Sequence, residues 1–159
     1  MGYMTTGNRR PSARIFVGVE RFADPWHDFR ASGEAVATAL HAIGVDARVE
    51  DFAPDALTEL DTSDLVVINA GYDRSTNVPL SKAWTDGFAS LSQYINDGRP
   101  LLALHSTAAT FRAVDGGHRL IGGAWIDGES MHPPRTLSRV DTDPAHALTR
   151  QCASFETLD

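Results

Sequence analysis

His105 and Ser106 directly follow the apolar run of residues 100–104, where the chain changes from an apolar pattern to a polar one. If this run is a central strand of a parallel sheet, His105 lies on the turn at the strand's carboxyl end, where open α/β sheets bind their ligands. Imidazole can act as a base, an acid or a metal ligand near neutral pH. We therefore expect His105 to be functional, although a histidine hydrogen-bonded beneath a loop would fit the same pattern.

Three further residues near strand ends are candidates for the same site. Ser106 is either a nucleophile or a helix N-cap, and no residue is fixed by spacing as its base. His27 follows the first apolar run and is a second catalytic candidate. Asp28, beside it, either binds substrate or caps the following helix.

A divalent metal such as zinc is another interpretation of these residues. His132 lies in a proline-rich loop that can fold over the same edge, together with Glu129. His27, His105 and His132 would then be the ligands, but no pair of them has the close helical spacing of a strong zinc motif. The glycine pairs near residues 116 and 122 lack the strand-turn-helix context of a nucleotide site.

The strands and helices that position these residues can be predicted from the spacing of apolar residues along the sequence. Short apolar runs predict strands, and those without alternation favour a parallel sheet covered on both faces. The expected strands are residues 14–20, 45–52 (alternating, and so nearer an edge), 65–70 and 100–104.

Helices are expected between these strands. One is capped by Asp28 and ended by Gly44, with an apolar stripe from Phe29 to Ile43; another is capped by Ser81 and ended by Gly98. A short helix is expected near residues 54–60. This alternation requires right-handed crossovers and predicts a doubly wound, mostly parallel α/β sandwich of three layers, as in flavodoxin. Beyond Thr110 we expect loops and one strand at residues 135–140.

Composition excludes several classes of protein. A chain of 159 residues with 42% hydrophobic residues suits one domain. We expect residues 1–13 to form a disordered extension and residues 14–159 to form that domain. The net charge of −7 argues against a nucleic acid or anionic membrane partner. One cysteine, no signal-like start and no long apolar run predict a cytoplasmic protein that does not enter membranes.

These residues together resemble the ThuA-like family, named for trehalose utilisation. The resemblance rests on the order and spacing of several short segments along most of the chain after residue 14. They are residues 26–29 (WHDF), 104–106 (LHS), 120–123 (LIGG), 131–133 (MHP), 143–149 (DPAHALT) and 155–159 (FETLD). Small departures are Ala103 and Thr107, where the family usually has glycine and alanine. Family members also continue past the segment that corresponds to residues 155–159, so the resemblance implies that a C-terminal segment is lacking.

The resemblance implies a fold related to class I glutamine amidotransferases and a role in the catabolism of trehalose or a related disaccharide. Relatives with amidotransferase activity have a cysteine at the turn where this chain has His105, so glutaminase activity is not expected. A sugar-processing activity would be hydrolase-like or lyase-like. Tyr72 and Asp73 follow the third expected strand, where Tyr72 would stack on a sugar ring and Asp73 would bind its hydroxyls, although an aromatic residue in an ordinary surface loop fits the same pattern. His132 and Glu129 would bind the substrate with them.

The alternatives are a non-catalytic module that binds a sugar or metabolite, and a domain that needs a partner chain, such as a second copy, to complete its sheet.

Overall fold

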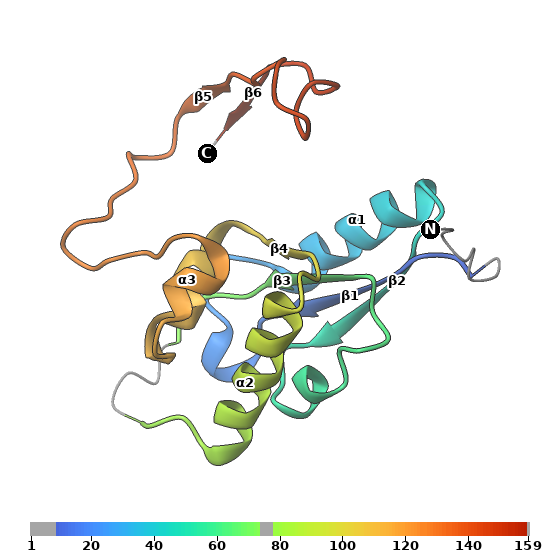
Figure 1. Cartoon of the computed structure of the whole chain (residues 1–159). Coiled ribbons are helices and arrows are strands. Elements are labelled where there is room, and N and C mark those ends of the chain that lie inside the picture. Colours follow the sequence, from blue (N-terminus) through green and yellow to red (C-terminus); the bar gives the residue numbers. More distant parts are fainter. Residues whose placement is uncertain (1–8, 74–77, 159) are drawn as a thin grey trace. The chain divides into compact units, whose positions relative to one another are not determined.

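The computed structural model describes residues 9–73 and 78–158. The chain divides into two compact units, one ending at Trp125 and the other beginning at Ile126. The first unit contains an α/β sheet with its helices, and the second contains a small antiparallel hairpin (Figure 1).

The sheet of the first unit has four parallel strands in the order β2-β1-β3-β4. Its strands are β1 (Ser12–Val17), β2 (Asp46–Asp51), β3 (Leu65–Asn69) and β4 (Leu101–Ala103). This order is that of flavodoxin-like folds, in which the direction of winding changes between β1 and β3 and ligands bind outside the carboxyl ends at that point. The predicted doubly wound α/β class is confirmed.

The two main helices begin and end where local chemistry predicts. The carboxylate of Asp28 accepts a hydrogen bond from the Ala31 N–H at the start of α1 (Phe29–Ala42), and Gly44 follows this helix with φ +85°. The hydroxyl of Ser81 caps α2 (Lys82–Asn96) in the same way, and Gly98 follows with φ +78°. Both glycines adopt the left-handed conformation that ends helices at little steric cost.

Apolar side chains on each face of the sheet form a separate core. Ile15, Val17 and Val67 point to the face covered by α1, where they contact Phe29 and Ala37. On the opposite face, covered by α2 and the short 3-10 helix η2 (Asp55–Thr58), the core is larger and more aromatic. It includes Phe16, Phe22, Phe52, Leu57, Val66, Ile68, Phe88, Leu91 and Phe111. Strands buried on both faces give the continuous apolar runs seen in the sequence.

The interpretation of His105 assumes that residues 100–104 form a central strand. Within the described residues, β4 instead pairs only with β3 and forms an edge of the sheet. Leu102 lies opposite Val67, and its side chain is 43% exposed because α1 covers β1 and its neighbours rather than β4. A short edge strand can have a continuous apolar sequence even though only one of its faces is packed against the core.

Smaller differences concern the ends of elements. The first strand ends at Val17, because residues 20–22 form the 3-10 helix η1 (Glu20–Phe22) instead of extending it. Ile43 was assigned to the packed stripe of α1 but lies beyond the helix and is 75% exposed. Where loops were expected after Thr110, η3 (His105–Ala113) continues and α3 (Gly117–Ile121) follows.

The second unit contains β5 (Leu137–Val140) and β6 (Phe155–Leu158), which pair antiparallel. The strand expected at residues 135–140 is therefore confirmed, whereas β6 was not anticipated. Residues 155–158 (FETL) are few and do not alternate between apolar and polar side chains, so they give no strong strand pattern.

Across residues 9–73 and 78–158, none of the helices has the length and apolar content needed to cross a membrane.

Candidate functional site

His105 occupies a strained turn at the carboxyl end of β4. Its φ of 41° places a residue with a β-carbon in the left-handed region, which costs about 1 kcal/mol and is seen where a fold aims a side chain outward. The imidazole is exposed. The turn therefore resembles in geometry the elbow on which α/β enzymes present a reactive residue.

Buried hydroxyls of η3 hold this turn against the end of β3. Thr107 is fully buried, and its hydroxyl donates to the Ile68 carbonyl at 2.8 Å and accepts from the Ala70 N–H at 3.3 Å. The Thr110 hydroxyl reaches the Gly71 carbonyl at 2.8 Å. These bonds satisfy polar backbone groups where the strand ends and also fix the position of His105.

The loop between β1 and α1 is organised by a buried carboxylate. The Asp24 side chain is 4% exposed, and its Oδ1 accepts the backbone N–H groups of Trp26 at 2.9 Å and His27 at 3.0 Å. Oδ1 also accepts a hydrogen bond from Nδ1 of the His27 ring at 2.7 Å. A β-carbon on Gly71 would come within 2.7 Å of Asp24 Oδ2, so glycine is needed there.

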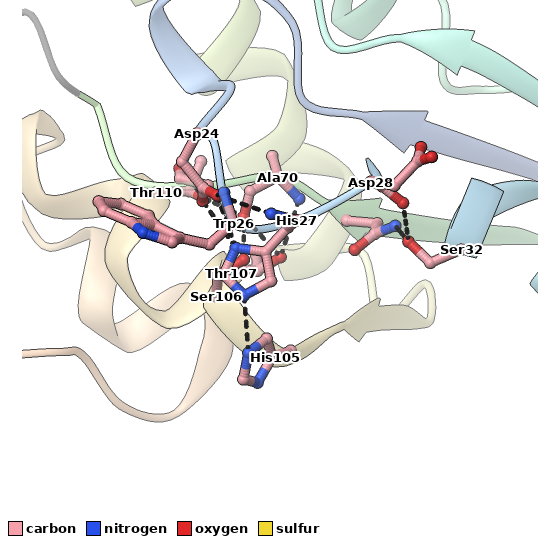
Figure 2. A network of polar contacts seen from close by, with 12 residues as sticks. Asp24, Trp26, His27, Asp28, Ser32, Ala70, His105, Ser106, Thr107 and Thr110 are labelled. Atoms are coloured by element: carbon pink, nitrogen blue, oxygen red, sulfur yellow. Dashed lines mark hydrogen bonds and ion pairs between the residues drawn. The ribbon is translucent and has the colours of Figure 1, made fainter. Parts of the chain in front are cut away.

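His27 and His105 face each other through their Nε2 atoms, which are 3.0 Å apart (Figure 2). The Asp24 carboxylate can only accept, so neutral His27 must carry its proton on Nδ1 and present a lone pair at Nε2. This network assigns the proton between the rings to Nε2 of His105. The other nitrogen of His105, Nδ1, is then unprotonated and can act as a base.

The predicted residues His27 and His105 are thus brought together by elements 78 residues apart in the sequence. They come from the loops after β1 and β4, at the carboxyl edge of the sheet next to the change of winding direction. His27 also stacks on Phe29, with ring centroids 5.4 Å apart, which limits the rotation of its ring. The arrangement can transfer a proton along a carboxylate and two imidazoles.

Ser106 is not the N-cap of η3 in this structure, and its role as a nucleophile stays a prediction. Its hydroxyl donates to the Ala70 carbonyl at 3.1 Å, so its proton is directed at the backbone rather than at a histidine. Leu104 rather than Ser106 occupies the cap position of η3. Ser106 therefore helps to hold the turn.

Three predicted substrate-binding residues of the first unit already have partners. Asp28 caps α1. The Asp73 carboxylate, with its side chain 6% exposed, forms a bidentate ion pair with Arg21. The Arg112 guanidinium lies 4.7 Å from the centroid of the half-buried Tyr72 ring. These contacts give each side chain a structural role before any ligand binds.

Glu129 and His132 belong to the second unit, which begins at Ile126. Both are exposed, and Nδ1 of His132 lies 2.9 Å from the Pro133 carbonyl. Their roles in substrate or metal binding remain predictions.

A zinc ion bound by both Nε2 atoms would need them about 3.3 Å apart, given Zn–N bonds of about 2.0–2.1 Å and a tetrahedral angle. The observed 3.0 Å is close to this value, and a carboxylate on the second nitrogen of a histidine is common around zinc. Within the described residues, however, no cluster of three or more histidine, cysteine or acidic side chains can hold a metal. Two ligands are fewer than the three that catalytic zinc sites use, so the donor set of this unit does not fit the ion by itself.

Sequence reasoning missed Asp24. Its signal is the spacing Asp-x-x-His, in which the carboxylate can bind the backbone N–H groups two and three residues later and then the histidine ring.

A separate hollow of about 1280 Å³ lies at the amino ends of β1 and β2, lined among others by Arg10, Arg48 and His41. It is at the opposite edge of the sheet from the histidine pair.

The fold of this chain is similar to that of a protein from Bacteroides uniformis ATCC 8492 that is described as ThuA-like, with a TM-score of 0.68 and 99% of this chain covered. The chain has the fold of a ThuA-like protein. The two sequences are 17% identical, and this chain spans 62% of the length of the other. The fold implied by the sequence resemblance is thereby confirmed. No family model and no curated protein matches the sequence.

Proposed function

We propose that this chain is a ThuA-like domain that binds a small carbohydrate at the carboxyl edge of its sheet, with His105 as the general acid and base. The family motifs along the sequence and the fold support the assignment to the family. Trehalose or a related disaccharide, in native or oxidised form, is the substrate class that the family name suggests.

The observation that carries the catalytic part of this proposal is the chain of contacts from Asp24 through His27 to His105. An exposed imidazole with an unprotonated nitrogen can take a proton from a sugar hydroxyl, or from a carbon made acidic by a neighbouring carbonyl. The positive charge that then forms on His105 is shared with His27, since the proton between the two Nε2 atoms can move. The buried Asp24 carboxylate compensates that charge.

Such a histidine supports lyase-like or hydrolase-like chemistry. In the first case the base removes a proton next to a carbonyl, the electron pair forms a double bond, and the glycosidic oxygen leaves with a proton returned by the imidazolium. In the second case the base takes a proton from the attacking water, whose oxygen bonds to the anomeric carbon as the glycosidic C–O bond breaks, and the imidazolium returns the proton to the leaving oxygen. Neither step needs the thiolate of a glutaminase, which His105 replaces.

A binding module is the second candidate function. It is favoured by the way Asp24 and His27 are held in place, because a fixed hydrogen-bonding loop also suits recognition without turnover. In that case His105 would only hydrogen-bond the sugar.

The test compares His105→Ala with the wild-type protein and with His41→Gln. His41 is an exposed histidine near the opposite edge of the sheet, so its replacement controls for loss of an imidazole. Trehalose, maltose and their keto derivatives are followed by calorimetry for binding and by NMR of the sugar for turnover.

We expect turnover to be abolished in His105→Ala, binding to change by less than about fivefold, and His41→Gln to behave as wild type. Binding without turnover by the wild-type protein would establish the module instead. If none of these sugars binds or is converted, the carbohydrate proposal is wrong.

A further inference from the structure

Trp26 is the most exposed aromatic residue among the described residues of the first unit, at 78%. It immediately precedes His27, so the α-carbons of the two residues are about 3.8 Å apart. Figure 2 shows its indole beside the network formed by Asp24, His27 and His105. A large aromatic ring exposed next to a polar network can offer its face to a ligand.

The backbone of Trp26 is fixed although its side chain is free. Its N–H donates to Asp24 Oδ1 at 2.9 Å, in the same turn that holds His27. The indole makes no ring contact with another aromatic or cationic group within residues 9–73 and 78–158, whereas Trp84 packs against Phe22, Phe52 and Phe88. With 78% of Trp26 exposed, most of its ring is accessible to solvent, on a loop that needs little further ordering to bind a ligand.

Tyr72 was the aromatic residue expected to stack on a sugar, but the structure makes it a poor candidate. Its ring is half-buried, and the Arg112 guanidinium lies over it. Trp26 has the larger ring, lies closer in sequence to the catalytic candidates and has no such partner. The chemistry assigned to Tyr72 suits Trp26 better.

Resting on the proposed function, we infer that Trp26 is a sugar-stacking residue that places one ring of a disaccharide beside His105. The negative face of the indole attracts the C–H groups on the apolar face of a pyranose, while the exposed His105 offers a polar contact near it. The residues next to Trp26 and His27 in the sequence are Pro25 and Asp28, and the Asp28 side chain caps α1. Protein interfaces are centred on larger apolar surfaces, which favours a small ligand here.

The first experiment is an NMR titration of the wild-type protein with trehalose and then with its keto derivative. The three tryptophans give three indole N–H signals, and Trp26→Phe identifies that of Trp26 by its loss. We expect the Trp26 signal to shift on addition of sugar, while the signal of the core residue Trp84 stays in place.

The second experiment measures sugar affinity by calorimetry in Trp26→Ala and Trp26→Phe. Loss of the stacked face should weaken binding by about tenfold in the alanine variant, whereas phenylalanine should retain it within about threefold. Because the side chain is exposed, both variants should unfold at the wild-type temperature.

The outcomes separate this inference from the proposed function. If sugar binds, the Trp26 signal does not move and Trp26→Ala keeps full affinity, the stacking role is wrong while the carbohydrate proposal stands. If Trp26→Ala instead dissociates an oligomer without affecting sugar affinity, the ring is a protein contact and the inference is also overturned. If no sugar binds to the wild-type protein, the proposed function itself fails, and the stacking role fails with it.

Discussion

Replacement of Asp24 tests the geometry on which the site depends. This carboxylate accepts three hydrogen bonds, from the N–H groups of Trp26 and His27 and from Nδ1 of the His27 ring, at 2.7–3.0 Å. It is the group that dictates which nitrogen of His27 carries the proton, and therefore how His27 meets His105.

The magnitude of the effect follows from those three bonds. Hydrogen bonds to a charged group contribute about 1.5–3 kcal/mol each, which gives about 4.5–9 kcal/mol for three. Removing the carboxylate also removes the cost of burying it, which is several kcal/mol for a side chain 4% exposed. We therefore expect Asp24→Ala to lower the free energy of unfolding by about 2–4 kcal/mol. Asp24→Asn keeps one acceptor oxygen and should lose about 1–2 kcal/mol.

The measurements are urea denaturation and nitrogen NMR of the histidine rings. In the wild-type protein we expect His27 protonated on Nδ1 and His105 on Nε2. In Asp24→Ala, His27 should shift toward the form with its proton on Nε2. His105 should then carry its proton on Nδ1, so that the hydrogen bond between the two Nε2 atoms reverses its direction. A wild-type His27 with its proton on Nε2, or a loss of stability below about 1 kcal/mol in Asp24→Ala, would refute this reasoning.

Three other substitutions test the supports of the site and of the sheet. Thr107→Val removes a fully buried hydroxyl with two backbone partners and should cost about 1–2 kcal/mol in urea denaturation; an unchanged midpoint would show that η3 is held by other contacts. Asp73→Asn should cost about 2–4 kcal/mol by breaking its buried ion pair with Arg21, and a stable variant would return Asp73 to the list of candidate ligand groups. Hydrogen bonds from the Arg14 guanidinium lower the pKa of Glu50 from its ordinary value of 4.5, so the resulting stability is present above about pH 4.5 and is lost as the pH falls through the lowered pKa. Because Glu50 is partly solvated, Glu50→Gln should lower the free energy of unfolding by at most about 1 kcal/mol at pH 7. The free energy of unfolding should also fall less steeply below about pH 4.5 in this variant, and an unchanged pH dependence would contradict this.

Local sequence patterns predicted most elements of the first unit. The caps Asp28 and Ser81 and the stop residues Gly44 and Gly98 act within a few residues of themselves, so their effect can be recognised without the rest of the fold. The edge position of β4 could not be predicted in this way, because the apolar pattern of a strand carries no information about how many strands pair with it.

In the candidate site, too, local features could be predicted from the sequence, whereas contacts between distant segments could not. The position of His105 after a strand is a local feature, and so is that of His27, which is why both were predicted. The partners of Asp73 and Tyr72 come from other segments, Arg21 from η1 and Arg112 from η3, and this removed both from the set of free ligand groups.

The sequence by itself determined the alternation of strands and helices, the residue types at the carboxyl edge and the absence of a thiol at the turn. Only the tertiary structure decided that His27 meets His105, that Asp24 orients the pair and that Trp26 is left exposed beside it. The physical reason is that periodicity and capping depend on neighbours along the chain. Hydrogen bonds between loops depend instead on strand order, which brings residues 78 positions apart to within 3.0 Å of each other.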